Sequence, residues 1–206
     1  MERISIVDPT SLSRALAVLQ KGGVIVYPTE TAYGLGADAT NPEAVRTVCD
    51  IKARDDGKPV PIIVGDAKQA RQYVFFTPEA EVLIEAFWPG PLTLILAALD
   101  GAFAQTLRAE DDVALRASGL EWCRELALAL DRPITSTSAN ASGKPTEYSI
   151  DGVYKSLGHT AEFVDLWVDG GTLRNGPVST IVRLVNGVEI RREGAVSGEE
   201  IRKLLK

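Results

Sequence analysis

Hydroxyl groups, a carboxylate and two glycines crowd into one short stretch, residues 27–36, which reads YPTETAYGLG. Thr29, Thr31 and Tyr33 supply hydroxyls that can both donate and accept hydrogen bonds. The apolar run at residues 24–26 comes directly before this stretch and predicts a buried strand. Polar loops at strand ends are where α/β proteins place ligands, so the stretch is a candidate binding site.

Gly34 and Gly36 close the stretch, and glycine permits backbone shapes and close ligand approach that other residues resist. Each residue taken singly also fits an ordinary capped turn. The combination of all of them favours a site.

Three basic residues, Lys52, Arg54 and Lys58, lie within seven positions at the end of a predicted helix. Lysine is a mobile point charge and arginine a planar fork, and both suit phosphate or carboxylate oxygens. A solvated helix end, whose cations complement the helix dipole, is an equally good interpretation from charge alone. Asp55 and Asp56 cancel part of the charge.

A second polar loop, TSTSANASGKPT at residues 135–146, overlaps the end of a predicted strand at residues 134–137. Small hydroxyl residues and exposed backbone N–H groups can cradle phosphate oxygens. The loop fails the P-loop template because Pro145 separates Lys144 from Thr146. A long surface turn is the alternative.

Arginines end two predicted strands. Arg116 closes the strand at residues 113–116, and Arg191 and Arg192 close the second strand of a predicted hairpin. Each could be an exposed strand-end charge or a contact for an anion. Ser179 begins a further strand and could be a simple cap.

Bulk composition limits the function classes. The chain has 206 residues, 45% of them hydrophobic, with a formal net charge of -6, so a general nucleic-acid coat protein is disfavoured. Cys49 and Cys123 lie far apart and are expected to be reduced, which fits a cytoplasmic location. With His159 as its one histidine, the chain is not expected to hold a histidine-rich metal site. No membrane span or signal peptide is expected.

Helices and strands are expected to intermix in one α/β domain with a mixed, twisted sheet. Asn186-Gly187 between two apolar runs predicts a hairpin of residues 182–185 and 188–191. Helices are expected at residues 12–19, from Asn41-Pro42 to about 52, after Asp66, from 77 to 87, at 122–130 and after Ser197; further strands are expected at 60–64 and 92–97.

The ordered motifs resemble those of the YrdC/TsaC family of threonylcarbamoyl-AMP synthases. They are PTETAYGL at 28–35, IKAR at 51–54 with Lys58-Pro59, WPGPLT at 88–93, VALR at 113–116, SANASG at 138–143 and STIV at 179–182. The match runs from about residue 10 to residue 196. It predicts one YrdC-like domain over residues 1–206, without the extra C-terminal domain of longer members.

The resemblance implies an α/β fold, a twisted mixed sheet flanked by helices, with a large concave, locally positive cavity. It also implies an enzyme that makes threonylcarbamoyl-AMP and pyrophosphate from L-threonine, bicarbonate and ATP with Mg²⁺. A downstream tRNA threonylcarbamoyl-transferase complex would then modify adenosine 37 of tRNAs that read codons starting with A. Direct tRNA binding by this chain is expected to be weak at most.

The resemblance further assigns roles to individual residues. Lys52 and Arg54 would act in catalysis, and Arg116 would clamp the threonine carboxylate. ATP contacts are expected from Arg54, Lys58, Asp112, Ser138, Thr146 and Arg192, and L-threonine contacts from Thr31, Ile63, Arg116, Ser136 and Ser179. No protein side chain is expected to bind the metal, and residues 52–59 are expected to close over the nucleotide.

The chain departs from the family pattern at several positions. Residues 55–57 intervene where many relatives have a short proline loop, Pro61 replaces an aliphatic residue, and Thr137 replaces a proline. Ile63 stands where some relatives have histidine, so a contact there would have to come from the backbone.

Two alternatives stay open. One is an RNA-binding module, which the acidic charge and the 6% aromatic content oppose. The other is a carbamoyl-transfer domain of the hydrogenase-maturation type, which usually belongs to a larger protein with cysteine clusters.

Overall fold

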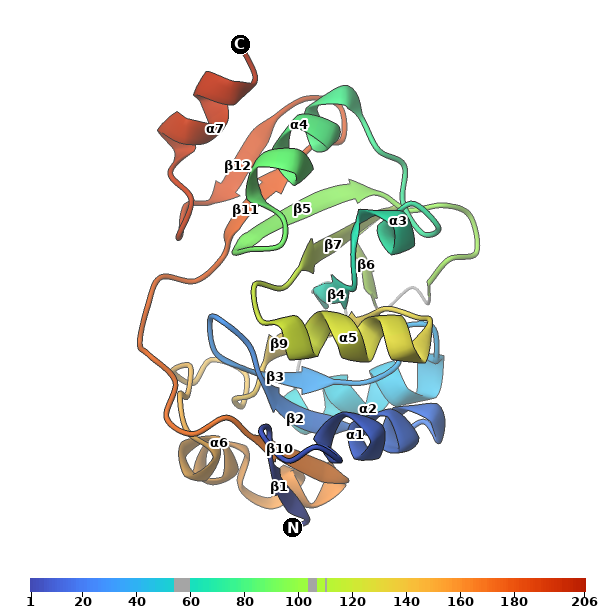
Figure 1. Ribbon diagram of the computed structural model, residues 1–206, viewed down its shortest axis with the longest axis vertical. Helices are drawn as coiled ribbons and strands as arrows, with labels where there is room; N and C mark the ends of the chain where they lie inside the picture. Colours follow the sequence, from blue (N-terminus) through green and yellow to red (C-terminus); the bar gives the residue numbers. More distant parts are fainter. Residues whose placement is uncertain (54–59, 104–106, 110) are drawn as a thin grey trace.

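Two mixed β-sheets lie one above the other in the computed structural model, which describes residues 1–53, 60–103, 107–109 and 111–206 (Figure 1). The α/β class and the mixed strand pairing are as predicted. The strands divide between two sheets, however, where the sequence suggested one.

The lower sheet has the strand order β1-β10-β2-β3-β9. The strands β1, β10 and β2 pair in parallel, and β2-β3 and β3-β9 pair antiparallel. The bounds are β1 Arg3–Ser5, β10 Leu166–Asp169, β2 Ile25–Pro28, β3 Tyr33–Gly36 and β9 Thr137–Ser138.

The upper sheet has the order β12-β11-β5-β7-β4-β8, and β6 pairs with β7. Parallel and antiparallel pairs alternate along it. The bounds are β12 Glu189–Arg192, β11 Thr180–Arg183, β5 Leu92–Ala97, β7 Asp112–Ala117, β4 Ile62–Val64, β8 Ile134–Thr135 and β6 Arg108–Ala109.

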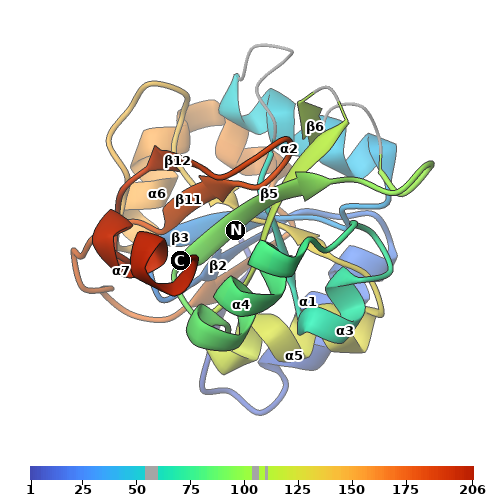
Figure 2. The same ribbon diagram turned by 90° about the horizontal axis from the view of Figure 1, so that it is seen from above.

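Among the described residues, helices cover both faces of the lower sheet and mainly one face of the upper sheet, where β4 meets a helix, α5 (Glu121–Leu130), on the other face. The helices α1 (Ser11–Gln20) and α5 bury apolar residues against one face of the lower sheet, and α2 (Pro42–Lys52) and α6 (Ile150–Leu157) cover the other. A short 3₁₀ helix, Gly158–Phe163, follows α6. Figure 2 shows α2 and α6 on the opposite side of the molecule from α1 and α5.

The upper sheet packs one face against α3 (Ala67–Ala70), α4 (Pro78–Phe87) and α7 (Gly198–Leu204). Leu92, Leu94 and Leu96 of β5 point into that core. Because side chains alternate along a strand, the intervening residues of β5 face the space toward the lower sheet.

The predicted helix starts are confirmed in detail. The Asn41 side chain accepts hydrogen bonds from the N–H groups of Glu43 and Ala44, with Pro42 in the first turn. Thr77 caps α4, and Ser197 with Glu200 forms the expected capping box at α7.

The predicted hairpin is confirmed as β11-β12, and Asn186 and Gly187 adopt positive φ angles of 60° and 123°. Its strands begin and end a residue or two away from the predicted bounds. Pairing with β5 extends β11 back to Thr180.

The predicted strand at residues 134–137 proved wrong as a single element. It breaks at Ser136, so that β8 pairs with β4 in the upper sheet and β9 pairs with β3 in the lower sheet. The Ser136 N–H donates to the carbonyl of Pro61 over 2.7 Å. Residues 134–138 therefore form a junction between the two sheets.

Candidate active site

A cavity of about 420 Å³ lies between the open face of the upper sheet and the β2-β3 hairpin of the lower sheet. Hydroxyl groups and two guanidinium groups supply most of its polar surface. Its lining consists of Thr29, Thr31, Ala32, Tyr33, Gly34, Pro61, Thr93, Ile95, Ala114, Arg116, Ser136, Thr137, Ser138, Thr146, Val178, Ser179, Ile181 and Arg192.

Strand alternation explains the upper wall. Thr93 and Ile95 of β5 and Ala114 and Arg116 of β7 line the cavity, whereas their neighbours on each strand belong to the core under α4. The predicted apolar strand 113–116 thus delivers its arginine to the cavity face. This placement excludes the exposed strand-end alternative for Arg116.

The lower wall is a tight turn at residues 29–32, between β2 and β3. The hydroxyl of Thr29 donates to the carbonyl of Ala32 over 2.7 Å and accepts the N–H groups of Thr31 and Ala32, each at 3.1 Å. The Thr29 and Thr31 hydroxyl oxygens are 2.9 Å apart. One buried hydroxyl therefore organises the whole turn.

The contact between the Thr29 and Thr31 hydroxyls is limited by the single proton that each hydroxyl carries. A hydroxyl carries one proton, and that of Thr29 goes to the Ala32 carbonyl. The Thr31 hydroxyl therefore donates either to Thr29, whose oxygen also accepts two N–H groups, or into the cavity, and its lone pairs face Arg116 Nη2, which is 3.5 Å away, and the cavity. Thr31 is set to accept a hydrogen bond from a ligand.

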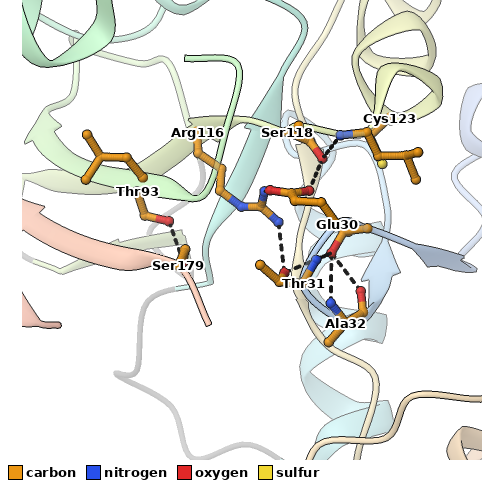
Figure 3. A network of polar contacts seen from close by, with 12 residues as sticks. Glu30, Thr31, Ala32, Thr93, Arg116, Ser118, Cys123 and Ser179 are labelled. Carbon is orange, nitrogen blue, oxygen red and sulfur yellow. Dashed lines mark hydrogen bonds and ion pairs between the residues drawn. The ribbon is translucent and has the colours of Figure 1, made fainter. Parts of the chain in front are cut away.

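Arg116 lies at the centre of the polar network in Figure 3. Its Nη1 forms an ion pair with Glu30, and its Nη2 points toward Thr31. The second carboxylate oxygen of Glu30 accepts the hydroxyl of Ser118. Buried arginine needs such partners because an isolated charge is costly to remove from water.

A second network lies farther along the upper sheet, around Ser179 just before β11. Ser179 Oγ accepts hydrogen bonds from the Thr93 hydroxyl at 3.0 Å and from Arg192 Nη2 at 3.1 Å. The Arg192 guanidinium also donates to the Ser179 carbonyl. With both lone pairs of its hydroxyl engaged, Ser179 keeps its own proton for a ligand.

Arg192 makes no ion pair with any residue that the structure describes. Burial and repulsion by Arg116 lower its pKa from the ordinary value. Among the described lining residues there is no carboxylate. The cavity therefore has an excess of positive charge although the chain is acidic, which suits an anionic ligand.

The structure brings together seven of the residues predicted for the site: Thr31, Arg116, Ser136, Ser138, Thr146, Ser179 and Arg192. They come from segments far apart in the sequence. These segments come together around the junction of the two sheets at Ser136.

Three predicted residues lie outside the lining. Lys52 is 3% exposed, and its ammonium donates to the carbonyls of Ser138 and Asn140, so it holds the second polar loop. Asp112 forms an ion pair with Arg183 over 2.6 Å. Ile63 is packed in the core, between residues of β2 and α5.

Arg54 and Lys58, and with them the predicted closure of residues 52–59 over a nucleotide, fall on residues 54–59, which lie outside the described residues.

The prediction of special backbone shapes for the two glycines needs correction, although Gly34 does line the cavity. Tyr33–Gly36 is strand β3, and neither Gly34 nor Gly36 has a positive φ. A Cβ on Gly36 would lie 2.7 Å from the ring of Tyr27, so this glycine makes room for a buried tyrosine. The Tyr27 hydroxyl in turn donates to the carbonyl of Thr135 and joins the two sheets.

Sequence reasoning missed Thr93, Ile95, Ala114 and Ile181 as lining residues. Alternation in the apolar runs around them was the available signal. Knowing which face of the upper sheet is left uncovered required the fold.

Cys123 is a free, buried cysteine, and burial raises the pKa of its thiol to about 12. Within the described ranges there is no group of three or more His, Cys, Asp or Glu residues placed to hold a metal ion. Helices of the described chain are all too short or too polar to cross a membrane.

Fold and site together define an α/β protein with an arginine-lined cavity between two mixed sheets. The Sua5/YciO/YrdC family model, described as "Telomere recombination", matches residues 17–194. The chain belongs to this family.

Curated relatives carry the name threonylcarbamoyl-AMP synthase. The protein of Pyrococcus abyssi is 34% identical over 93% of this chain, and that of Bacillus subtilis is 34% identical over 99%. This chain covers only 56% and 59% of those two proteins. The Vibrio cholerae relative is 36% identical over 89% of this chain, which covers 97% of that protein.

Solved structures agree. P. abyssi Sua5 complexed with L-threonine superposes with a TM-score of 0.90 at 31% identity, over 99% of this chain and 60% of that one. Escherichia coli YciO gives 0.84 at 26% identity, over 97% and 98% of the two chains. HypF, at 19% identity and a TM-score of 0.77, shares the fold.

Proposed function

We propose that this chain is a threonylcarbamoyl-AMP synthase, which forms the adenylate and pyrophosphate from L-threonine, bicarbonate and ATP. The observation that supports this most is the presence of two polar networks in one cavity, that of Arg116 with Thr31 and that of Arg192 with Ser179. Relatives that bear this name share the family and the fold.

The network of Arg116 and Thr31 suits an amino acid. The Nη2 edge of Arg116 offers a charge-assisted hydrogen bond to a carboxylate. Thr31 accepts from the neighbouring amine. Ser136, at the junction of the sheets, is the third threonine contact that we propose on this side.

The network of Arg192 and Ser179 suits the nucleotide phosphates. Arg192 has a guanidinium without a carboxylate partner among the described residues. Ser179, expected from the resemblance to contact threonine, bonds to Arg192 and has a hydroxyl proton available to an acceptor, so we propose it on the phosphate side instead. Ser138 and Thr146 border the same space. Contacts from Arg54, Lys58, Asp112 and the backbone of Ile63 remain part of this proposal from the family resemblance.

The reaction needs positioning and charge stabilisation more than covalent help from the protein. The threonine nitrogen adds to the carbon of bicarbonate, and loss of water gives the N-carboxylate. One oxygen of that carboxylate forms a bond to the α-phosphorus of ATP as the bond to pyrophosphate breaks. Arg116 and Arg192 would hold the two anionic reactants within one cavity against their mutual repulsion.

Magnesium would enter with ATP, carried by phosphate oxygens and water, as that ion prefers. The hydroxyl-rich lining fits this arrangement because it offers neutral oxygens around the phosphates. Lys52, predicted to act in catalysis, would act by holding the Ser138–Asn140 segment in place.

The product adenylate would pass to a tRNA threonylcarbamoyl-transferase complex that modifies adenosine 37. Direct tRNA binding would be weak because the chain's net charge is -6.

The test is pyrophosphate release by the purified chain with ATP and magnesium, with threonine and bicarbonate each left out in turn. Release that requires both supports the proposal. Arg116→Ala should then raise the KM for threonine by about tenfold to a hundredfold, the usual loss for a charged hydrogen bond.

Arg191→Ala is the matched control, because Arg191 is exposed and pairs with Glu189. It should leave the KM for threonine and the KM for ATP unchanged. Release that is independent of threonine, or no release from folded protein, would contradict the proposed function.

A further inference from the structure

Glu30 contacts Arg116 from outside the cavity. Arg116 and Thr31 are lining residues, and Glu30 is not. Its carboxylate bridges Arg116 Nη1 and the Ser118 hydroxyl, as Figure 3 shows. One edge of the guanidinium is therefore occupied by the protein itself.

The segment that holds the other end of Glu30 is built for this contact. The Ser118 hydroxyl donates to Glu30 and accepts the N–H of Leu120 over 3.2 Å, just before α5 begins. Arg124 holds the Ser118 carbonyl at 2.8 Å. A Cβ on Gly119 would lie 3.3 Å from the Glu30 side chain, so Gly119 packs closely beside this carboxylate.

We infer that Glu30 is a positioning residue: it fixes the plane of the Arg116 guanidinium so that only the Nη2 edge, beside Thr31, meets the bound substrate. The inference rests on the proposed function for the identity of that substrate. The Arg116 side chain is 7% exposed and that of Glu30 is 21% exposed, so water does little to orient either group.

Glu30 also offsets the repulsion between Arg116 and Arg192, because its carboxylate pairs with Arg116. Arg116 and Arg192 face the same cavity and repel each other. Without the Glu30 carboxylate, the Arg116 guanidinium would turn away from Arg192 or toward the substrate anion in several orientations. With it, the guanidinium has one orientation before the substrate arrives, which lowers the cost of ordering it on binding.

The experiment compares Glu30→Ala, Glu30→Gln and Ser118→Ala in the full chain. Glu30→Ala should raise the KM for threonine about tenfold and leave the KM for ATP within twofold. Glu30→Gln keeps an oxygen that can accept from Arg116, so it should restore most of the loss. Ser118→Ala should raise the threonine KM two- to threefold.

Asp38→Asn is the matched control for loss of stability. Asp38 is likewise a carboxylate paired with an arginine, but its partner, Arg132, does not line the cavity, whereas Arg116 does. It should lower the melting temperature and leave both KM values unchanged. Glu30 variants that follow this pattern, or that raise both KM values equally, would overturn the inference.

A crystal structure of Glu30→Ala tests the inference separately from the proposed function. Displacement of the Arg116 guanidinium from Thr31 supports a positioning role even if the wild-type chain releases no pyrophosphate. An unchanged guanidinium would overturn it.

Discussion

Hydrogen bonds within the protein limit what single hydroxyl groups in this cavity can offer a ligand. Thr29 spends its proton on the Ala32 carbonyl, so Thr31 presents an acceptor; Ser179 receives two hydrogen bonds and presents a donor. A ligand with an N–H group at the Thr31 end and an anionic oxygen at the Ser179 end satisfies both. Under the proposed function, the threonine amine supplies the first group and a phosphate of ATP supplies the second.

Thr31→Val tests the acceptor role of Thr31 at the residue scale. Valine has the same shape without the oxygen, so the threonine amine loses its acceptor, and the KM for threonine should rise by about tenfold or more. Thr31→Ser keeps the oxygen and should stay within threefold of wild type. Kinetics of pyrophosphate release at saturating ATP give the comparison, and equal effects of the two substitutions would refute this role.

At the scale of elements, local signals in the sequence identified most helices and strands. Caps such as Asn41-Pro42 and the Asn186-Gly187 turn act within a few residues, so their outcomes could be predicted. The break at Ser136 could not, because it depends on β4 and β3 competing for the same segment. The strands β1 and β10 were missed because each is short and pairs with distant partners.

The site was predictable to a similar degree. Residues in ordered motifs, such as Arg116 and Ser179, were assigned by resemblance and do line the cavity. Lys52 and Asp112 are charged, but the sequence alone did not show their partners. Lys52 donates to the carbonyls of Ser138 and Asn140, and Asp112 pairs with Arg183. Partners of this kind are decided by packing between elements.

Gly36 and Gly34 give a prediction for strand β3. A Cβ at Gly36 would lie 2.7 Å from the Tyr27 ring, whereas one at Gly34 would lie at an ordinary 3.4 Å. Gly36→Ala should therefore lower the free energy of unfolding by about 1–3 kcal/mol, the usual cost of overpacking. Gly34→Ala, in the same strand beside the same ring, should change it by less than about 1 kcal/mol. Urea denaturation measures both, and equal losses would contradict this packing.

Asp169 joins three elements of the lower sheet and gives a prediction for pH. It accepts from Arg3 of β1 at 2.8 Å and from the Gly171 N–H at 2.8 Å, and Tyr33 of β3 also donates to it. Burial raises its pKa, but these hydrogen bonds outweigh burial and lower the pKa below its ordinary value of 3.8.

A carboxylate with a lowered pKa contributes stability that is present above the unfolded value and lost as the pH falls through the folded value. The stability difference between wild type and Asp169→Asn should therefore be constant from pH 7 to about 4 and shrink below that. Asp151→Asn is the control, because Asp151 also pairs with Arg3 but is exposed. Unfolding curves from pH 7 to pH 2 provide the test, and a difference that persists unchanged at pH 2 would contradict it.

The whole molecule combines a net negative charge with a cavity lined by two arginines. Its net charge is -6, yet the described cavity lining carries Arg116 and Arg192 and no carboxylate. A small anion can enter the cavity and contact both guanidinium groups. A long polyanion extends beyond the cavity and is repelled by the net negative charge of the chain. The same contrast separates a nucleotide-using enzyme from an RNA-binding module.

We therefore expect ATP and tRNA to respond differently at the scale of the whole chain. ATP should bind more weakly as NaCl rises from 0.05 to 0.5 M, because ions screen the cavity charges, and Arg192→Ala should weaken it by about tenfold. Arg191→Ala, one residue away and exposed, should have no effect on ATP. Binding of tRNA should be undetectable at micromolar protein in 0.15 M NaCl. Calorimetry for ATP and gel-shift titration for tRNA make the comparison. Tight tRNA binding that survives in Arg192→Ala would show that the net negative charge is no barrier, and would favour the RNA-binding module over the synthase.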